Sequence, residues 1–126
     1  MIKTEQLKKL RETAQFKIHW NYLGWKDEMG MYYHTQKEWN STLVTKITQI
    51  SAHLFQHTDR RGAHSVYAGP KAFEILVAYE HFNPIISGVY GVISNRNVYL
   101  VNQSPTDEVL VLNDEVCGLI TIENLK

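Results

Sequence analysis

The hydrophobic pattern is clearest between residues 41 and 58. Apolar side chains recur there at steps of three and four, a spacing that places them on one side of an α-helix. Asn40 or Ser41 can cap the start of this helix, because their side-chain oxygens accept hydrogen bonds from the first free amides. Gly62 can end it in the left-handed conformation. We therefore predict a long amphipathic helix whose apolar side is formed by Leu43, Val44, Ile47, Ile50, Leu54 and Phe55.

Two other stretches also predict helices. Residues 2–17 carry apolar residues among charged ones at a moderate helical spacing, and Thr4 can cap the start of this helix. Residues 70–82 (PKAFEILVAYEHF) begin with a proline, which a first helical turn tolerates because it lacks amide partners. Asn83 and Pro84 stop this second helix. Its small polar face predicts that it is largely buried.

The C-terminal third of the chain has the composition of β-strands, rich in valine and isoleucine and divided by turn-forming residues. A short strand is also expected just before the proline-initiated helix. The sequence thus predicts an α+β fold with a long amphipathic helix, a second packed helix and a small mixed or antiparallel sheet. The expected strands cover residues 64–68, 88–93, 97–101, 108–113 and 118–124.

Residues 18–40 differ from the rest, because they hold many aromatic side chains and are broken by Gly24 and Gly30, which predicts a loop or hairpin. Such rings bury about 150 to 250 Å² each, so together they would form a sticky patch in water. They either pack on the core of their own domain or form an arm that covers a neighbouring subunit. We expect an N-terminal helix and aromatic-rich arm over residues 1–40 and an α+β core domain over residues 41–126.

Composition and charge narrow the class of protein. The chain has 126 residues, 44% hydrophobic and 21% charged, which is typical of one soluble globular domain. Thirteen basic residues balance thirteen acidic ones, so the net charge gives no attraction to nucleic acid or to an anionic membrane. The first twenty residues are nevertheless basic and the last twenty-five acidic. These are either solvated faces or a source of head-to-tail attraction between copies. No stretch approaches the roughly 18 apolar residues of a membrane span.

Three histidines raise the possibility of a metal site. His53 and His57 are four residues apart on the predicted helix, so both project from the same side, as a pair of zinc ligands requires. A metalloprotease helix has a glutamate directly after the first histidine, where this chain has Leu54. A small metal-binding or hydrolytic domain that uses these two residues together with Asp59 and His64 remains an alternative.

No other pattern points to catalysis. The single cysteine, Cys117, lies in an apolar stretch that would raise the pKa of its thiol and lower its reactivity. The sequence contains no G-x-S-x-G nucleophile motif and no phosphate-binding loop. We therefore expect a protein that is not an enzyme and that has no cofactor and no metal.

The segments HTDRRGAHSVYAGPKAFEIL, GVYGVISNRNVYLV and PTDEVLVLND follow the long predicted helix in that order. This arrangement resembles the major capsid proteins of tailed bacteriophages, especially the T-even-type branch. In that family a long helix ends in a Thr-x-Arg-Gly-like turn, and a strand then leads into a second helix. A glycine-punctuated segment, a Val-Tyr strand, an acidic turn and an apolar strand follow. The resemblance covers residues 39–124, in a chain much shorter than the several hundred residues of that family. The matching residues are Thr58, Arg61, Gly62, Ala63, Val66, Pro70, Leu76, Gly88, Gly91, Val98, Tyr99, Asp107 and Val111.

The resemblance implies a non-enzymatic virion structural protein that assembles with copies of itself or docks to other capsid subunits. It also implies a location in the virion, and in the host cytoplasm during assembly. Arg60 and Arg61 could then pair with Asp107, Glu108 or Asp114 of a neighbour, since arginine binds carboxylates through two parallel hydrogen bonds. Another interpretation is an adaptor that binds a different protein through its aromatic segment. The aromatic residues expected at the interface are Trp20, Trp25, Tyr32, Tyr33 and Trp39.

Overall fold

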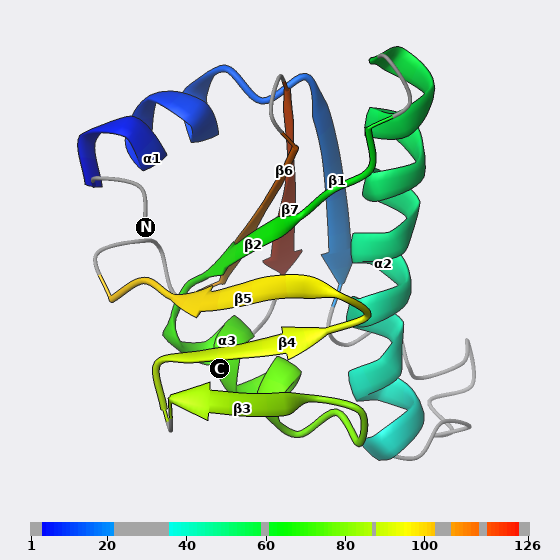
Figure 1. Ribbon diagram of the computed structural model, residues 1–126, viewed down its shortest axis with the longest axis vertical. Helices are drawn as coiled ribbons and strands as arrows, with labels where there is room; N and C mark the ends of the chain where they lie inside the picture. The colour runs from blue at the N-terminus through cyan, green and yellow to red at the C-terminus, as the bar shows by residue number, and fades with distance from the viewer. Residues whose placement is uncertain are drawn as a thin grey trace.

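The computed structural model describes residues 4–21, 36–58, 61–86, 88–102, 107–113 and 116–123, with the backbone alone at residues 4, 21, 36–41 and 123. Within these residues the chain forms three helices and a seven-stranded sheet (Figure 1). In chain order the elements are α1 (Thr4–Glu12), β1 (Phe16–Asn21), α2 (Gln36–His57), β2 (Ser65–Ala68), α3 (Pro70–Val77), β3 (Asn83–Ile86), β4 (Tyr90–Ile93), β5 (Arg96–Leu100), β6 (Glu108–Leu112) and β7 (Cys117–Glu123).

The strands lie in the order β1-β7-β6-β2-β5-β4-β3. β1 runs parallel to β7 and β2 runs parallel to β5, whereas the other neighbouring pairs are antiparallel. The predicted α+β class and mixed sheet are confirmed, but the expectation of a small sheet beside a dominant helix is wrong. The sequence did not predict two of the strands. β1 covers the expected end of the first helix and the start of the aromatic-rich stretch, and β3 contains Pro84, which was predicted only to stop a helix.

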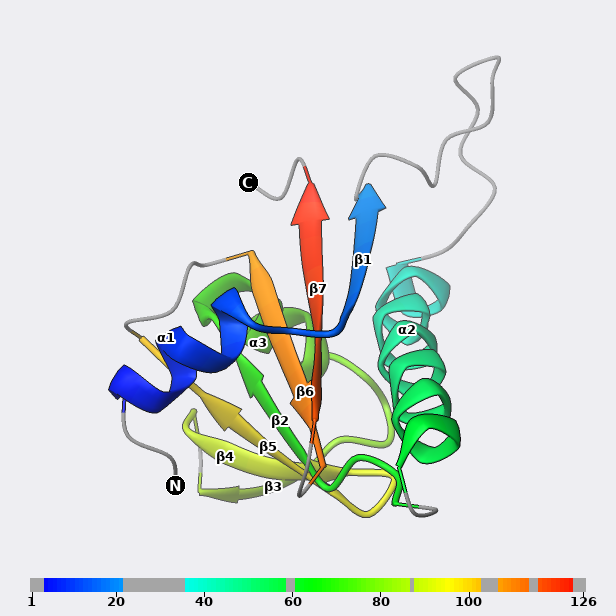
Figure 2. The ribbon, with the colours of Figure 1, turned by 90° about the horizontal axis from the view of Figure 1, so that it is seen from above.

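The sheet has a separate apolar core on each face. α2 and α3 pack on one face, and α1 packs on the other over β7. Figure 2 shows α1 and α2 on opposite sides of β6 and β7. β2 illustrates the consequence, because Val66 and Ala68 enter the core under α2 while Tyr67, between them, enters the core under α1. Covered on both faces, this central strand is fully buried.

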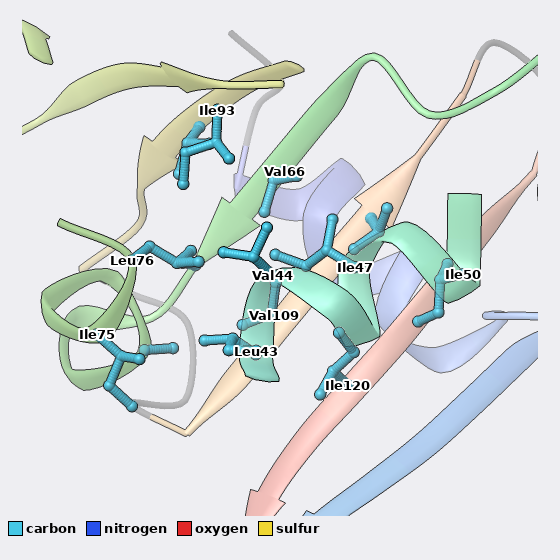
Figure 3. Close-up of a cluster of buried hydrophobic side chains, with 14 of the residues drawn as sticks. Leu43, Val44, Ile47, Ile50, Val66, Ile75, Leu76, Ile93, Val109 and Ile120 are labelled. Carbon is cyan, nitrogen blue, oxygen red and sulfur yellow. The ribbon is translucent and has the colours of Figure 1, made fainter. Parts of the chain in front are cut away.

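The main core is built where α2 crosses the sheet. Its buried side chains meet residues from α3, β2, β4, β6 and β7 (Figure 3). The helix comes so close to β7 that a Cβ atom on Gly118 would lie 2.5 Å from Cγ2 of Ile50, so a larger residue at that position would push the helix away. Phe55, predicted on the buried side, is 46% exposed. The predicted residues that α2 does bury are Leu43, Val44, Ile47, Ile50 and Leu54.

Residues 18–21, predicted as part of a loop or hairpin, instead belong to strand β1. The strand alternates Phe16, Ile18 and Trp20 toward the core under α2 with exposed Lys17 and His19. This two-residue period is the ordinary signature of a half-buried strand, and the high aromatic content concealed it. The remainder of the expected arm, residues 22–35, lies outside the described residues.

The helix ends also differ from the sequence prediction. α2 begins at Gln36, earlier than expected, while α1 and α3 are both shorter than their predicted spans. The shortening of α3 leaves room for β3, which begins at Asn83. None of the described helices is long and apolar enough to pass through a membrane.

Candidate association surface

The turn after α2, which carries part of the family-like motif, is held by a buried amide. Nδ2 of Asn113 donates hydrogen bonds to the carbonyl oxygen of Arg61 at 2.7 Å and to Oγ1 of Thr58 at 3.2 Å. Its Oδ1 accepts one from the backbone amide of Val116 at 2.8 Å. One side chain thus joins the end of α2 to the connection between β6 and β7. Thr58 and Arg61 therefore belong to a structural joint.

A second polar joint links α2 to the turn between β4 and β5. The hydroxyl of buried Ser51 accepts hydrogen bonds from the amide of Ala63 at 2.9 Å and from Nη2 of Arg96 at 3.2 Å. Burial lowers the pKa of Arg96, and its Nε has no hydrogen-bond partner among the described residues. Arg96 as a whole residue is partly exposed. We assign this cluster to the support of the fold.

The structure places two of the candidate metal ligands against an aromatic ring. His53 stacks on Phe16 of β1 with ring centroids 5.4 Å apart, and His57 lies tilted against the same ring at 5.0 Å. His64 lies apart from this contact, with Nδ1 2.7 Å from the hydroxyl of Ser65. Asp59 is outside the described residues. Within the described part of the chain, no three histidine, cysteine or acidic side chains come together in a way that could hold a metal ion.

The aromatic residues predicted at an interface do not share one location. Trp20 is only 6% exposed and belongs to the main core, which corrects its assignment to a surface. Trp39 lies in α2, where the structure describes only its backbone. Trp25, Tyr32 and Tyr33 lie outside the described residues, so their role stays a prediction.

The charged residues predicted at an interface are also separated. Arg60 is outside the described residues, and Arg61 is exposed at the turn after α2. Oε2 of Glu108 accepts a hydrogen bond from Nε of Arg11 at 2.6 Å, with both side chains largely buried. Glu108 thus has an ion-pair partner in its own chain, and its expected contact with an arginine of another copy stays a prediction. The basic N-terminal and acidic C-terminal segments meet, at least here, within one molecule.

An exposed apolar surface at the opposite edge of the sheet was not foreseen. Among the described strands, β3 lies at the edge of the sheet and pairs only with β4, and all four of its residues are exposed. Ile85 is 54% exposed and Ile86 57%. We name the group formed by Val77, Ile85, Ile86 and Val89 the β3 surface. The signal for it was present in the sequence, because isoleucines directly after a proline are compatible with an edge strand, where proline is tolerated.

A recess of about 370 Å³ adjoins the β3 surface, with Val77 belonging to both. Its walls are mostly apolar and contain one carboxylate. The floor is supported by Phe73, whose ring meets that of Phe82 edge-on at a centroid distance of 6.1 Å. Phe82 in turn covers Gly91 of β4, where a Cβ atom would collide with the ring. The recess is lined by Pro70, Phe73, Glu74, Val77, Gly88 and Leu100.

On the opposite face, three tyrosines form a ladder across β2, β5 and β4. The rings of Tyr67 and Tyr99 stack at 5.0 Å, and those of Tyr99 and Tyr90 stack at 4.8 Å. The hydroxyl of Tyr90 donates a hydrogen bond to Oδ1 of Asn97 at 2.8 Å. Burial, with a smaller effect from Tyr90, raises the pKa of Tyr99. The ladder therefore stabilises the outer strands and brings no nucleophile or acid–base pair together.

Comparisons of this chain with protein-family models, with curated proteins and with solved structures found no match.

Proposed function

We propose that this chain is a non-enzymatic structural protein that acts by associating with copies of itself or with other subunits of a shell. The observation that supports this most directly is the β3 surface. Its four apolar side chains are each about half exposed, and exposed apolar area of this kind is typical of a surface that another protein covers. Two of them, Ile85 and Ile86, lie on β3, an edge strand of the described sheet.

We propose more specifically a capsid or capsid-associated protein of a tailed bacteriophage, located in the virion and, during assembly, in the host cytoplasm. The order of elements supports this assignment, because α2 leads through a fixed turn to β2, and then to α3. The strands β4, β5 and β6 follow, in the order the family-like segments require. A shell subunit needs extended contact area against copies rather than a reactive pocket.

Sedimentation of the purified chain over a wide concentration range tests the proposal. We expect a mass above that of the 14.6 kDa monomer, rising with concentration. Co-sedimentation with purified phage shells tests the docking form of the same proposal. A chain that stays monomeric at millimolar concentration and does not bind shells would refute both forms.

A further inference from the structure

We propose that the recess beside α3 is a binding site for a small organic cation, a molecule with an apolar body and one ammonium group. The recess has a volume of about 370 Å³. This lies near the lower limit of small-molecule sites, which span about 300 to 1,000 Å³. Binding at this site requires no second copy of the chain, so it is independent of the proposed assembly.

One side of α3 forms most of the recess. Four residues spaced at helical steps of three and four share this side of the helix. The neighbouring residues Ile75 and Leu76 lie in the main core and fix the rotation of the helix (Figure 3). The recess is therefore formed before a ligand arrives, which lowers the ordering cost of binding. The four lining residues of α3 are Pro70, Phe73, Glu74 and Val77.

Gly88 and Leu100 line the rest of the recess. Gly88 has a φ of +75°, a left-handed conformation that favours glycine over other residues. A Cβ atom at this position would meet no atom within 4 Å. Glycine thus leaves this part of the recess open, with no side chain to narrow it.

The charge of the recess comes from Glu74, the one charged residue that lines it. Among the described residues its carboxylate has no hydrogen-bond or ion-pair partner, whereas that of Glu108 is paired with Arg11. Lys71, the one basic residue of α3, does not line the recess. A cation that enters the recess therefore supplies the missing opposite charge, and an anion is repelled.

The apolar lining determines the rest of the ligand. Phe73, Val77 and Leu100 present carbon surface, so the body of the ligand gains free energy by leaving water. A lysine side chain of another protein has only a narrow four-carbon stem, which would leave much of the recess unfilled. A small molecule with a ring and an ammonium group matches both the volume and the charge.

A titration with phenethylammonium chloride, followed by the amide resonances in NMR spectra, tests the proposal. Phenethyl alcohol is the matched neutral probe, because it has the same apolar body and no charge. We expect both probes to shift the resonances of residues around the recess. Phenethylammonium should bind about two to five times more tightly, the range expected for a charge pair that water partly screens.

Matched glutamine variants assign the charge. Glu74→Gln should lower the affinity for phenethylammonium about two- to fivefold and leave that for phenethyl alcohol unchanged. Glu80→Gln is the control, because it removes the same charge from an exposed carboxylate that follows α3 and does not line the recess. It should change neither affinity. Added salt should weaken the binding of phenethylammonium alone. Thermal unfolding verifies that both variants are folded.

Three outcomes overturn the proposal. Equal affinities for the two probes, or an equal loss in the two glutamine variants, would remove the role of Glu74 in recognising a cation. Absence of resonance shifts around the recess, up to the solubility limit of the probes, would remove the binding site itself. Tighter binding of N-acetyl-lysine methylamide than of phenethylammonium would assign the recess to a lysine side chain of a partner protein.

Discussion

The two edges of the sheet show how differently one protein can treat exposed strands. β1 sends Trp20 and its apolar neighbours into the core beneath α2 and turns Lys17 toward solvent. β3 leaves Ile85 and Ile86 more than half exposed and carries no charge. The first arrangement completes the core of the monomer, and the second leaves apolar area uncovered.

The difference follows from where the helices lie. α2 contacts β1, β6 and β7. α3 contacts β2 and β5, and it covers the β3 edge less than α2 covers the β1 edge. At Gly91, the ring of Phe82 covers β4 in the place that a helix would otherwise take. Burial of side chains at the β1 edge therefore contributes to folding, whereas the exposed apolar side chains at the β3 edge could be covered by another protein.

The largest expected effect comes from removing the tryptophan of β1. Trp20→Ala should lower the free energy of unfolding by about 3 to 5 kcal/mol, because it leaves a cavity in the main core. Ile85→Ala on β3 should change it by no more than about 0.5 kcal/mol, because that side chain is mostly exposed. Urea unfolding measures both. Equal effects at the two positions would remove the contrast between the edges.

A smaller effect is expected beneath the β3 edge. Gly91→Ala should destabilise the protein by about 1 to 3 kcal/mol, because the added methyl group collides with the ring of Phe82. Combining it with Phe82→Leu should recover part of that loss, relative to the sum of the two single changes. Thermal or urea unfolding of the four proteins gives the coupling energy. Additive effects would show that Phe82 does not occupy this space.

The ion pair that holds α1 near β6 tests whether the charged ends act within one molecule. Glu108→Gln should lower stability by about 1 kcal/mol, because it weakens the bond to Arg11. Arg11→Gln should have a similar effect, and the double variant should cost little more than either single one. Sedimentation should show unchanged association. A loss of association in Glu108→Gln, with stability retained, would instead support the predicted contact between copies.

The smallest effect is a dependence on alkaline pH at the tyrosine ladder. The pKa of Tyr99 is raised in the folded protein above its ordinary value of 10.0, so folding favours the protonated phenol. Its contribution to stability is complete below pH 10 and is lost as the pH rises through the folded pKa. Tyr99→Phe should reduce this alkaline loss, measured as the change in urea midpoint between about pH 9 and pH 11. An unchanged loss would assign it to other groups.

The strongest periodic patterns in the sequence were also the most accurate guides to structure. The helical repeat of residues 43–54 predicted a buried side of α2, and the valine-rich segments predicted β4 to β7 close to their observed bounds. β1 was missed because the aromatic content of residues 18–40 was interpreted as a sign of a loop or hairpin. β3 was missed because Pro84 stops a helix and can equally begin an edge strand.

The candidate site was less predictable than the fold. Whether Trp20 faces a core or a partner depends on the position of α2 above β1, which the local sequence does not contain. The same holds for Glu108, whose partner Arg11 lies 97 residues away in the chain. A tryptophan and a glutamate can each lie at an interface as well as inside one molecule. The residue type therefore does not show which role Trp20 or Glu108 has.

The sequence alone determined the α+β class, the apolar side of the long helix and most of the strands, because periodicity and turn chemistry are local properties of the chain. The tertiary structure decided the strand order, the burial of Trp20, the contacts of His53 and His57 with Phe16, and the exposure of β3. These depend on which segments meet across long separations. The hydrophobic effect is not directional, so burial alone does not choose the partner of an apolar side chain, and the packing of the whole molecule sets it.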